Sequence, residues 1–182
     1  MSQLSDQDIL ELIRKPDSKN YGFNLLIKKY QKKVYMHVRR LVLVHDDADD
    51  VTQDIFIKVF ENIDKFREQS QLFTWIYRIA TNEALSFLKK KKTRSFIFLS
   101  DITHKLGDSL QDDQLFDGNA IQQKLFKAVD RLPNKQKLVF NMKYFDEMKY
   151  EEISQVLGTS VGALKTSYHH AVKKIQQQLN IN

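Results

Sequence analysis

The feature that most restricts the fold of this chain is its shortage of residues that break helices. The 182 residues include 5 glycines and 2 prolines, whereas a strand-rich chain needs a turn residue roughly every 10 positions. Long stretches instead place apolar residues at steps of three and four, the spacing of one helix face. One example is VTQDIFIKVFENIDKF, with an apolar stripe at Val51, Ile55, Val59 and Ile63. We therefore predict an all-α fold.

Composition excludes several classes of protein. Apolar residues make up 42% of the chain, with 12 Phe, 7 Tyr and 1 Trp, which is ample for a core. The absence of cysteine excludes disulfides, thiolate metal sites and thiol nucleophiles. The first residues lack the apolar run of a signal peptide, and no stretch approaches the ~18 apolar residues of a membrane span. We expect a soluble cytoplasmic protein with no direct membrane contact and no metal or other cofactor.

Charge separates the chain into three segments. Residues 1–95 hold 18 Lys/Arg against 13 Asp/Glu, residues 96–120 hold 1 against 5, and residues 121–182 hold 10 against 5. The middle segment lacks sustained periodicity and collects Ser, Asp, Gly and Asn, which is typical of a linker. We predict two small helical domains, 1–95 and 121–182, joined by a flexible linker over 96–120. The basic excess of both domains indicates a polyanionic partner such as nucleic acid.

The C-terminal segment has the spacing of a helix-turn-helix. YEEISQVLG predicts a short helix ended by Gly158, and TSVGALKTSYHHAVKKIQQQL predicts a second helix capped by Ser160. The face opposite the second helix's apolar stripe is small and polar, able to enter a major groove, and consists of Gly162, Thr166, His169, His170 and Lys173. Lys165 and Lys174 flank this face and suit phosphates.

Other interpretations of the same segment remain open. A plain helical hairpin with a solvated polar face would show the same periodicity. A metal site at His169 and His170 is disfavoured, because adjacent side chains point about 100° apart on a helix and lack the i, i+4 partner of a zinc site.

A second surface for nucleic acid is predicted on LFTWIYRIATNEALSFLKKKK. Trp75, Arg78, Asn82, Ser86 and Lys89 share one helix face. Aromatic and guanidinium planes stack on unpaired bases, amides bind base edges, and lysines bind phosphates. The alternative is that Trp75 is a core aromatic and the lysine run a solvated helix end.

The densest acidity lies on the helix expected from about Asp47 to Ile63. The face opposite its apolar stripe carries Asp50, Gln53, Asp54, Ile57 and Glu61. An acidic face with a central isoleucine is typical of a protein-docking surface. The alternatives are that the acids stabilise the helix dipole or form a carboxylate metal site, although acids within one turn mostly diverge.

Two long segments resemble the extracytoplasmic-function (ECF) sigma factors, small sigma-70-type subunits of bacterial RNA polymerase. The segment FNLLIKKYQKKVYMHVRRLVLVHDDADDVTQDIFIKVFENIDKFREQSQLFTWIYRIATNEALSFLKKKKTR resembles their region 2. The segment LPNKQKLVFNMKYFDEMKYEEISQVLGTSVGALKTSYHHAVKKIQQQL resembles their region 4. The two segments follow in the family's order, with a linker between them.

The resemblance implies a non-catalytic factor that binds core RNA polymerase, through the beta-prime coiled coil and the beta flap, and promoter DNA. The core-docking residues that it implies are Asp49, Asp50, Gln53, Asp54 and Ile57. Those implied to melt and capture the minus-ten element, with a flipped base in a loop pocket, are Phe66, Arg67, Ser70, Phe73, Trp75, Arg78, Asn82, Lys89 and Lys90. Those implied for the minus-thirty-five element are Ser160, Gly162, Lys165, Thr166, His169, His170 and Lys173. An anti-sigma factor, which often holds family members inactive, is a candidate partner.

Two functions from different classes remain open. A sigma factor needs core polymerase to recognise a promoter, whereas an autonomous helix-turn-helix regulator binds duplex operator DNA alone. The face with Trp75, Arg78 and Asn82 favours the first, because a repressor of duplex DNA has no use for a base-stacking surface. An enzyme ranks below both, because the chain has no thiol, convergent acid pair or phosphate loop.

Many family members carry arginines near positions 167, 170 and 172, which are Ser, His and Val here.

Overall fold

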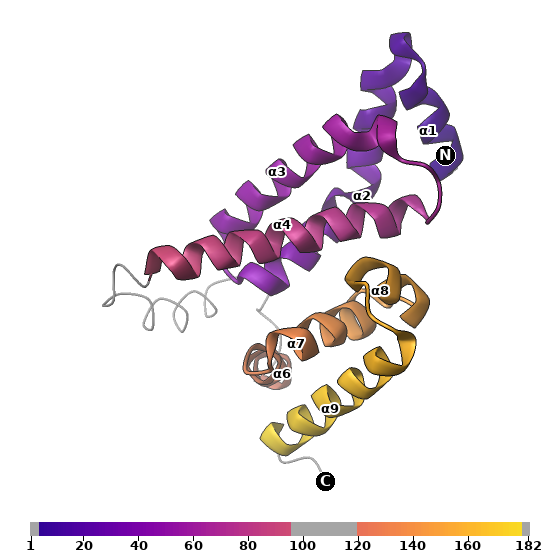
Figure 1. The fold of residues 1–182 in the computed structure, drawn as a ribbon. Helices are drawn as coiled ribbons and strands as arrows, with labels where there is room; N and C mark the ends of the chain where they lie inside the picture. Colours follow the sequence, from indigo (N-terminus) through magenta and orange to yellow (C-terminus); the bar gives the residue numbers. More distant parts are fainter. Residues whose placement is uncertain (1–3, 96–119, 180–182) are drawn as a thin grey trace. The chain divides into compact units, whose positions relative to one another are not determined.

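The computed structural model describes residues 4–95 and 120–179, and every regular element in these ranges is helical (Figure 1). The predicted all-α class is therefore confirmed for the described part of the chain. The predicted linker lies outside that part except for Ala120. The chain forms two compact units, Met1–Leu85 and Ser86–Asn182. Among the described helices, none combines the length and apolar character needed to cross a bilayer.

The N-terminal helices pack around one apolar core. They are α1 (Asp6–Arg14), the 3-10 turn η1 (Pro16–Ser18), α2 (Lys19–Val42), α3 (His45–Asn62), the 3-10 turn η2 (Ile63–Lys65) and α4 (Leu72–Ser95). Fully buried side chains come from each of the three long helices, among them Leu26 and Val34 of α2, Ile55 of α3 and Ile76 of α4. The division between the two compact units falls inside α4, after Leu85.

Helix α1 lies close against α2 at a glycine. A Cβ atom on Gly22 would come within 2.8 Å of the backbone nitrogen of Ile13, so this approach requires glycine. Ser5 and Asp8 form a capping box at the start of α1, in which the Asp8 amide donates to Ser5 Oγ at 3.1 Å and the Ser5 amide donates to Asp8 Oδ2 at 2.9 Å. The Ser5 hydroxyl, which donates to Asp8 Oδ2 at 2.6 Å, and then the Ser5 amide lower the pKa of Asp8.

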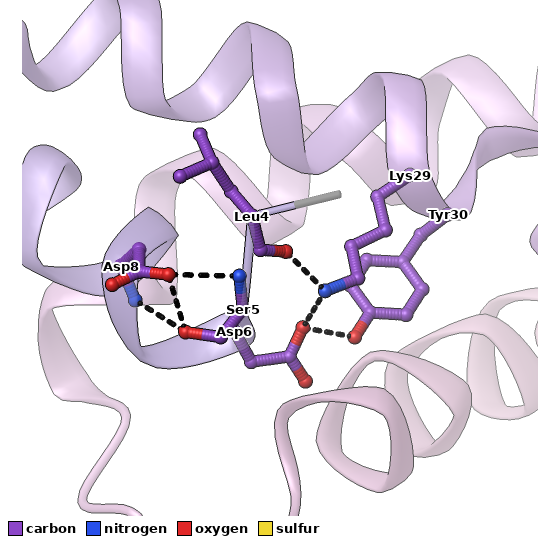
Figure 2. A network of polar contacts seen from close by, with 6 residues as sticks. All are labelled: Leu4, Ser5, Asp6, Asp8, Lys29 and Tyr30. Atoms are coloured by element: carbon purple, nitrogen blue, oxygen red, sulfur yellow. Dashed lines mark hydrogen bonds and ion pairs between the residues drawn. The ribbon is translucent and has the colours of Figure 1, made fainter. Parts of the chain in front are cut away.

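The same end of α1 is attached to α2 by a polar network (Figure 2). Tyr30 donates its hydroxyl hydrogen to Asp6 Oδ1 at 2.6 Å, and Lys29 Nζ lies 2.8 Å from the same oxygen. Lys29 also donates to the carbonyl oxygen of Leu4 at 2.9 Å. Burial, and then the contact with Asp6, raise the pKa of Tyr30, which therefore stays a protonated donor at neutral pH.

The apolar stripe predicted on α3 faces the core. Val51, Ile55, Val59 and Ile63 are all buried. The helix begins at His45, two residues before the predicted start, so Asp46 and Asp47 occupy its first turn and stabilise its dipole. Leu43, in the left-handed conformation with φ 66°, makes the turn between α2 and α3, and the Arg39 side chain donates to its carbonyl oxygen.

The C-terminal helices all lie in the second unit, which also contains the end of α4. They are α6 (Ala120–Asp130), α7 (Asn134–Phe140), the π-helical turn η3 (Asn141–Phe145), α8 (Tyr150–Leu157) and α9 (Val161–Leu179). The helical segment that begins at Asn134 continues from α7 directly into the π turn η3. The widened turn contains Asn141, which is 1% exposed and whose amide atoms have no hydrogen-bond partner among the described residues.

Candidate docking and nucleic-acid surfaces

One exposed face of α3 carries the predicted docking residues. Asp50, Gln53, Asp54 and Ile57 are exposed, and Asp49 is half-buried. Together with Glu61, which is also exposed, these five residues form the acidic face. Ile57 has 57% of its surface exposed, although the buried stripe on the opposite side of the helix already supplies the packing that α3 needs. The structure thus brings the predicted docking residues onto one solvent-exposed surface.

Contacts at both ends hold α3 and hence the acidic face. At its start, the Tyr35 hydroxyl and His45 Nδ1 are 2.7 Å apart, and His45 Nε2 lies 3.6 Å from Asp49 Oδ2. Nearer its end, Lys58 Nζ forms an ion pair of 2.5 Å with Glu83 of α4. The acidic face is therefore presented on a helix anchored to both neighbours, with a charge that repels DNA phosphates.

The second predicted surface lies along α4. Arg78, Asn82, Ser86, Lys89 and Lys90 are exposed, and Trp75 is half-buried. The other side of the helix is buried in the core through Leu72, Ile76 and Ala80. Trp75, Arg78 and Asn82, together with Lys89, therefore line one face, the α4 face, which offers an aromatic plane, a guanidinium group, an amide and an ammonium group in that order along the helix.

Two aromatic residues predicted to bind the minus-ten element pack against other rings in the free protein. Phe66 is only 8% exposed and its ring centroid lies 5.2 Å from that of Trp75. Phe73 is half-buried, with its ring 4.2 Å from Tyr77 and 6.1 Å from Tyr30 of α2. Phe66 thus packs against Trp75, and Phe73 packs at the start of α4 against Tyr30 of α2. Sequence alone could not show the burial of Phe66, because an aromatic residue in a loop has no periodicity that assigns it to a side.

The loop before α4, residues 66–71, keeps other predicted residues accessible. Arg67 is exposed and Ser70 is half-buried. Glu68 has φ 56°, the left-handed conformation that non-glycine residues rarely adopt. Its carboxylate forms an ion pair with Arg14 of α1. No sequence pattern indicated that pair, because its two residues are 54 positions apart.

The predicted helix-turn-helix is present in the C-terminal unit. Helix α8 ends at Gly158, which has φ 61° and whose amide donates to the Ser154 carbonyl at 2.9 Å. Ser160 caps α9, because its Oγ accepts from the Ala163 amide at 3.3 Å. The turn chemistry predicted from Gly158 and Ser160 is confirmed.

Helix α9 separates an inner and an outer face as predicted. Leu164, Ala171 and Ile175 are buried, and Tyr168 and Leu179 are half-buried. The residues predicted to contact DNA are all exposed, namely Ser160, Gly162, Lys165, Thr166, His169, His170 and Lys173. Thr166 donates its hydroxyl hydrogen to the Gly162 carbonyl at 3.1 Å. The outer face is small, polar and basic.

Tyr150 is a residue beside α9 that sequence reasoning did not select. Lys143 Nζ lies 5.0 Å and Lys165 Nζ 5.9 Å from its ring centroid. Two lysine ammonium groups therefore lie near the ring, beside the outer face of α9. Burial raises the pKa of Tyr150, and burial with nearby tyrosines raises that of Tyr168. Both remain neutral hydroxyl groups at physiological pH.

Within residues 4–95 and 120–179, no three acids or histidines are placed to hold a metal ion.

Comparison with known families matches both halves of the chain. Residues 26–94 match sigma-70 region 2, and residues 122–175 match sigma-70 region 4. The ECF RNA polymerase sigma-E factor of Escherichia coli K12 is 30% identical over 185 residues, which cover 97% of this chain and 95% of the relative. The chain belongs to the ECF sigma factors of the sigma-70 family. As an ECF sigma factor it directs core RNA polymerase to promoters, and the alternative of an autonomous regulator is set aside.

Other comparisons agree with this family. The sigma-E factor of Haemophilus influenzae Rd is also 30% identical, over 97% of this chain and 96% of the relative. Sigma factor RpoE of Bartonella quintana, solved with the anti-sigma factor NepR, has a TM-score of 0.71 at 22% identity, covering 88% of this chain and 98% of that chain. CnrH, solved with the cytosolic domain of CnrY, has a TM-score of 0.70 at 18% identity, covering 97% and 98%. At these identities the two solved structures show that the fold is shared.

Proposed function

We propose that this sigma factor divides its work among the three surfaces described above. The acidic face of α3 docks on the beta-prime coiled coil of core polymerase. The α4 face, with the 66–71 loop, opens the minus-ten element and captures an unpaired base. The outer face of α9 binds the minus-thirty-five element, and the same domain contacts the beta flap. Residues 1–95 and 121–182 act as the two domains, with 96–120 as the linker between them.

The observation that carries the proposal is the composition of the α4 face. An indole ring, a guanidinium group and an amide lie in succession on one exposed side of a helix whose other side is buried. Stacking on an aromatic ring contributes about 1–3 kcal/mol per base, which can offset the few kcal/mol of unstacking that base flipping costs. A surface for duplex DNA alone would have no use for the exposed aromatic plane, because the bases of a duplex are already stacked on one another.

The acidic face of α3, in contrast, fits a protein partner and not DNA. Its carboxylates repel the phosphate backbone but attract a basic protein surface, and its exposed isoleucine adds apolar area at the centre. The partner is therefore a protein with basic residues around an apolar contact. That description applies to a docking element of the core enzyme, and it separates protein binding on α3 from DNA binding on α4.

We further propose that this chain is non-catalytic and that an anti-sigma factor regulates it. RNA synthesis belongs to the core enzyme, and this chain contributes no catalytic group. An anti-sigma factor controls it by covering the polymerase-binding surfaces. The support is that the structural neighbours RpoE and CnrH were each solved with a partner protein, NepR and the CnrY cytosolic domain respectively.

The test is run-off transcription on promoter fragments with core polymerase, with and without the protein. New start sites that need the protein are expected. Asp50→Lys should lower core binding, whereas Glu11→Lys, an equal charge reversal at an exposed position of α1, should not. If Asp50→Lys transcribes as well as the wild type, the docking assignment is wrong.

A second pair of variants tests the DNA surface. Asn82→Ala should leave core binding intact but lower the permanganate reactivity of thymines in the minus-ten element, because one base-contacting amide is lost. Asn24→Ala removes an exposed amide from α2 and serves as the matched control. Equal reactivity in both variants would remove Asn82 from the proposed site.

A further inference from the structure

Three contacts join the α1–α2 hairpin to the segment around the 66–71 loop. Before the loop, Asp64 of η2 forms an ion pair of 2.7 Å with Lys19 at the start of α2. Within the loop, the Glu68 carboxylate pairs with the guanidinium group of Arg14 at the end of α1. After the loop, the Phe73 ring contacts Tyr30 of α2. One hairpin thus holds the loop at its entrance, its middle and its exit.

The hairpin is itself well braced at the other end of α1. Figure 2 shows that the Asp6 carboxylate accepts a hydrogen bond from Tyr30 and forms an ion pair with Lys29, both of α2. Tyr30 therefore contacts α1 through its hydroxyl group and Phe73 through its ring. A change in the position of α1 is transmitted to the start of α4 as well as to the loop.

The loop has a shape that needs external support. Glu68 adopts a left-handed backbone conformation that its own Cβ disfavours, so surrounding contacts must stabilise it. Its flanking residue Phe66 is buried against Trp75, the aromatic residue of the α4 face. Movement of the loop would therefore also disturb the ring on which an unpaired base is proposed to stack.

We propose that Arg14 is a positioning residue, which holds the 66–71 loop through Glu68 in the shape that receives an unpaired base of promoter DNA. This inference rests on the proposed role of the loop and extends it to α1, a helix that lies before the region 2 match at residues 26–94. Arg14 contributes geometry and makes no DNA contact. Its side chain is 50% exposed and that of Glu68 40% exposed, so the pair contributes little to global stability and acts mainly on the loop.

The first test compares Arg14→Gln with Lys15→Gln in the complete holoenzyme. Lys15 is exposed and adjacent, so its variant removes the same charge without breaking the pair. Promoter opening is followed by 2-aminopurine fluorescence in the non-template strand of the minus-ten element. Arg14→Gln should lower the opening rate about two- to five-fold, the range expected for loss of an exposed ion pair. Lys15→Gln should leave it unchanged, and both variants should keep the wild-type midpoint of thermal unfolding and affinity for core.

The second test exchanges the two charges. Arg14→Glu places two carboxylates together and should slow opening more than Arg14→Gln does. Adding Glu68→Arg to Arg14→Glu rebuilds the pair in the reverse direction and should restore most of the rate. Recovery would show that the pair acts on opening. If the double variant opens as slowly as Arg14→Glu, or if Arg14→Gln and Lys15→Gln have equal effects, the positioning role is wrong.

Asn82→Ala, measured in the same assay, distinguishes a failure of the proposed base-capture function from a failure of the positioning role of Arg14. If Asn82→Ala slows opening while the Arg14 variants do not, the base-capture function stands and the positioning role falls. If Asn82→Ala and Arg14→Gln both open at the wild-type rate, the DNA role of this surface fails and the positioning role fails with it.

Discussion

Truncation of Ile57 should weaken docking on core polymerase without weakening the fold. The side chain lies at the centre of the acidic face and has 57% of its surface exposed in the free protein. Burial of a whole isoleucine side chain contributes roughly 1.5–3 kcal/mol, so covering this exposed share would contribute roughly 0.9–1.7 kcal/mol. Alanine removes about three quarters of the side chain and would lose roughly 0.6–1.3 kcal/mol, a factor of about 3 to 9 in Kd.

The assay is fluorescence anisotropy of the labelled protein titrated with core polymerase. Ile57→Ala should raise Kd by that factor and leave the free energy of unfolding within about 0.5 kcal/mol of the wild type, because the residue packs little in the monomer. Ile121→Ala is the matched control, since Ile121 is 72% exposed on α6 and lies outside the proposed docking surface. A Kd for Ile57→Ala equal to that of Ile121→Ala would refute the reasoning.

Three further predictions concern stability. Gly22→Ala should lower the free energy of unfolding by about 1–3 kcal/mol in urea denaturation, because the added Cβ meets the Ile13 backbone at 2.8 Å; an unchanged midpoint would contradict this close approach. Asn141→Leu should raise it by about 1–3 kcal/mol, since its buried amide atoms lack partners among the described residues; a loss of stability would indicate a partner for that amide. Asp8 stabilises α1 as the carboxylate, because its folded pKa is lowered by Ser5, so this contribution is present above the unfolded pKa and is lost as pH falls through the folded pKa. Ser5→Ala should reduce that acid dependence in hydrogen exchange of α1 amides, because only the Ser5 amide would still donate to Asp8, and a dependence of undiminished size would assign it to another group.

Local patterns account for the helices and the helix-turn-helix. The stripe from Val51 to Ile63 and the inner face of α9 were predicted from spacing alone, because burial of a helix face leaves a period of 3.6 residues in the sequence. Gly158 and Ser160 marked the turn, because the left-handed cap and the N-cap each require particular residue types. The π turn after Phe140 was not predicted, since no residue there breaks the helical pattern.

The same reasoning from local patterns predicted only part of the candidate site. Exposed residues on regular helices, such as Asp50 and Arg78, were assigned to the correct faces, because helical geometry orients them. Phe66 was assigned to the surface and is buried, because the direction of a loop side chain depends on what packs against it. Tyr150 was overlooked because its proximity to Lys165 depends on the packing of α8 against α9.

By itself, the sequence determined an all-α chain with an acidic helix, a helix that carries Trp75, Arg78 and Asn82 on one face, and a helix-turn-helix, because each of these is encoded by residues within a few turns of one another. Only the tertiary structure decided which aromatic rings are buried and which residues brace the 66–71 loop. Arg14 and Glu68, like Lys19 and Asp64, are brought together by the packing of whole helices. Such contacts join residues more than forty positions apart and leave no local pattern, so they emerge only when the core closes.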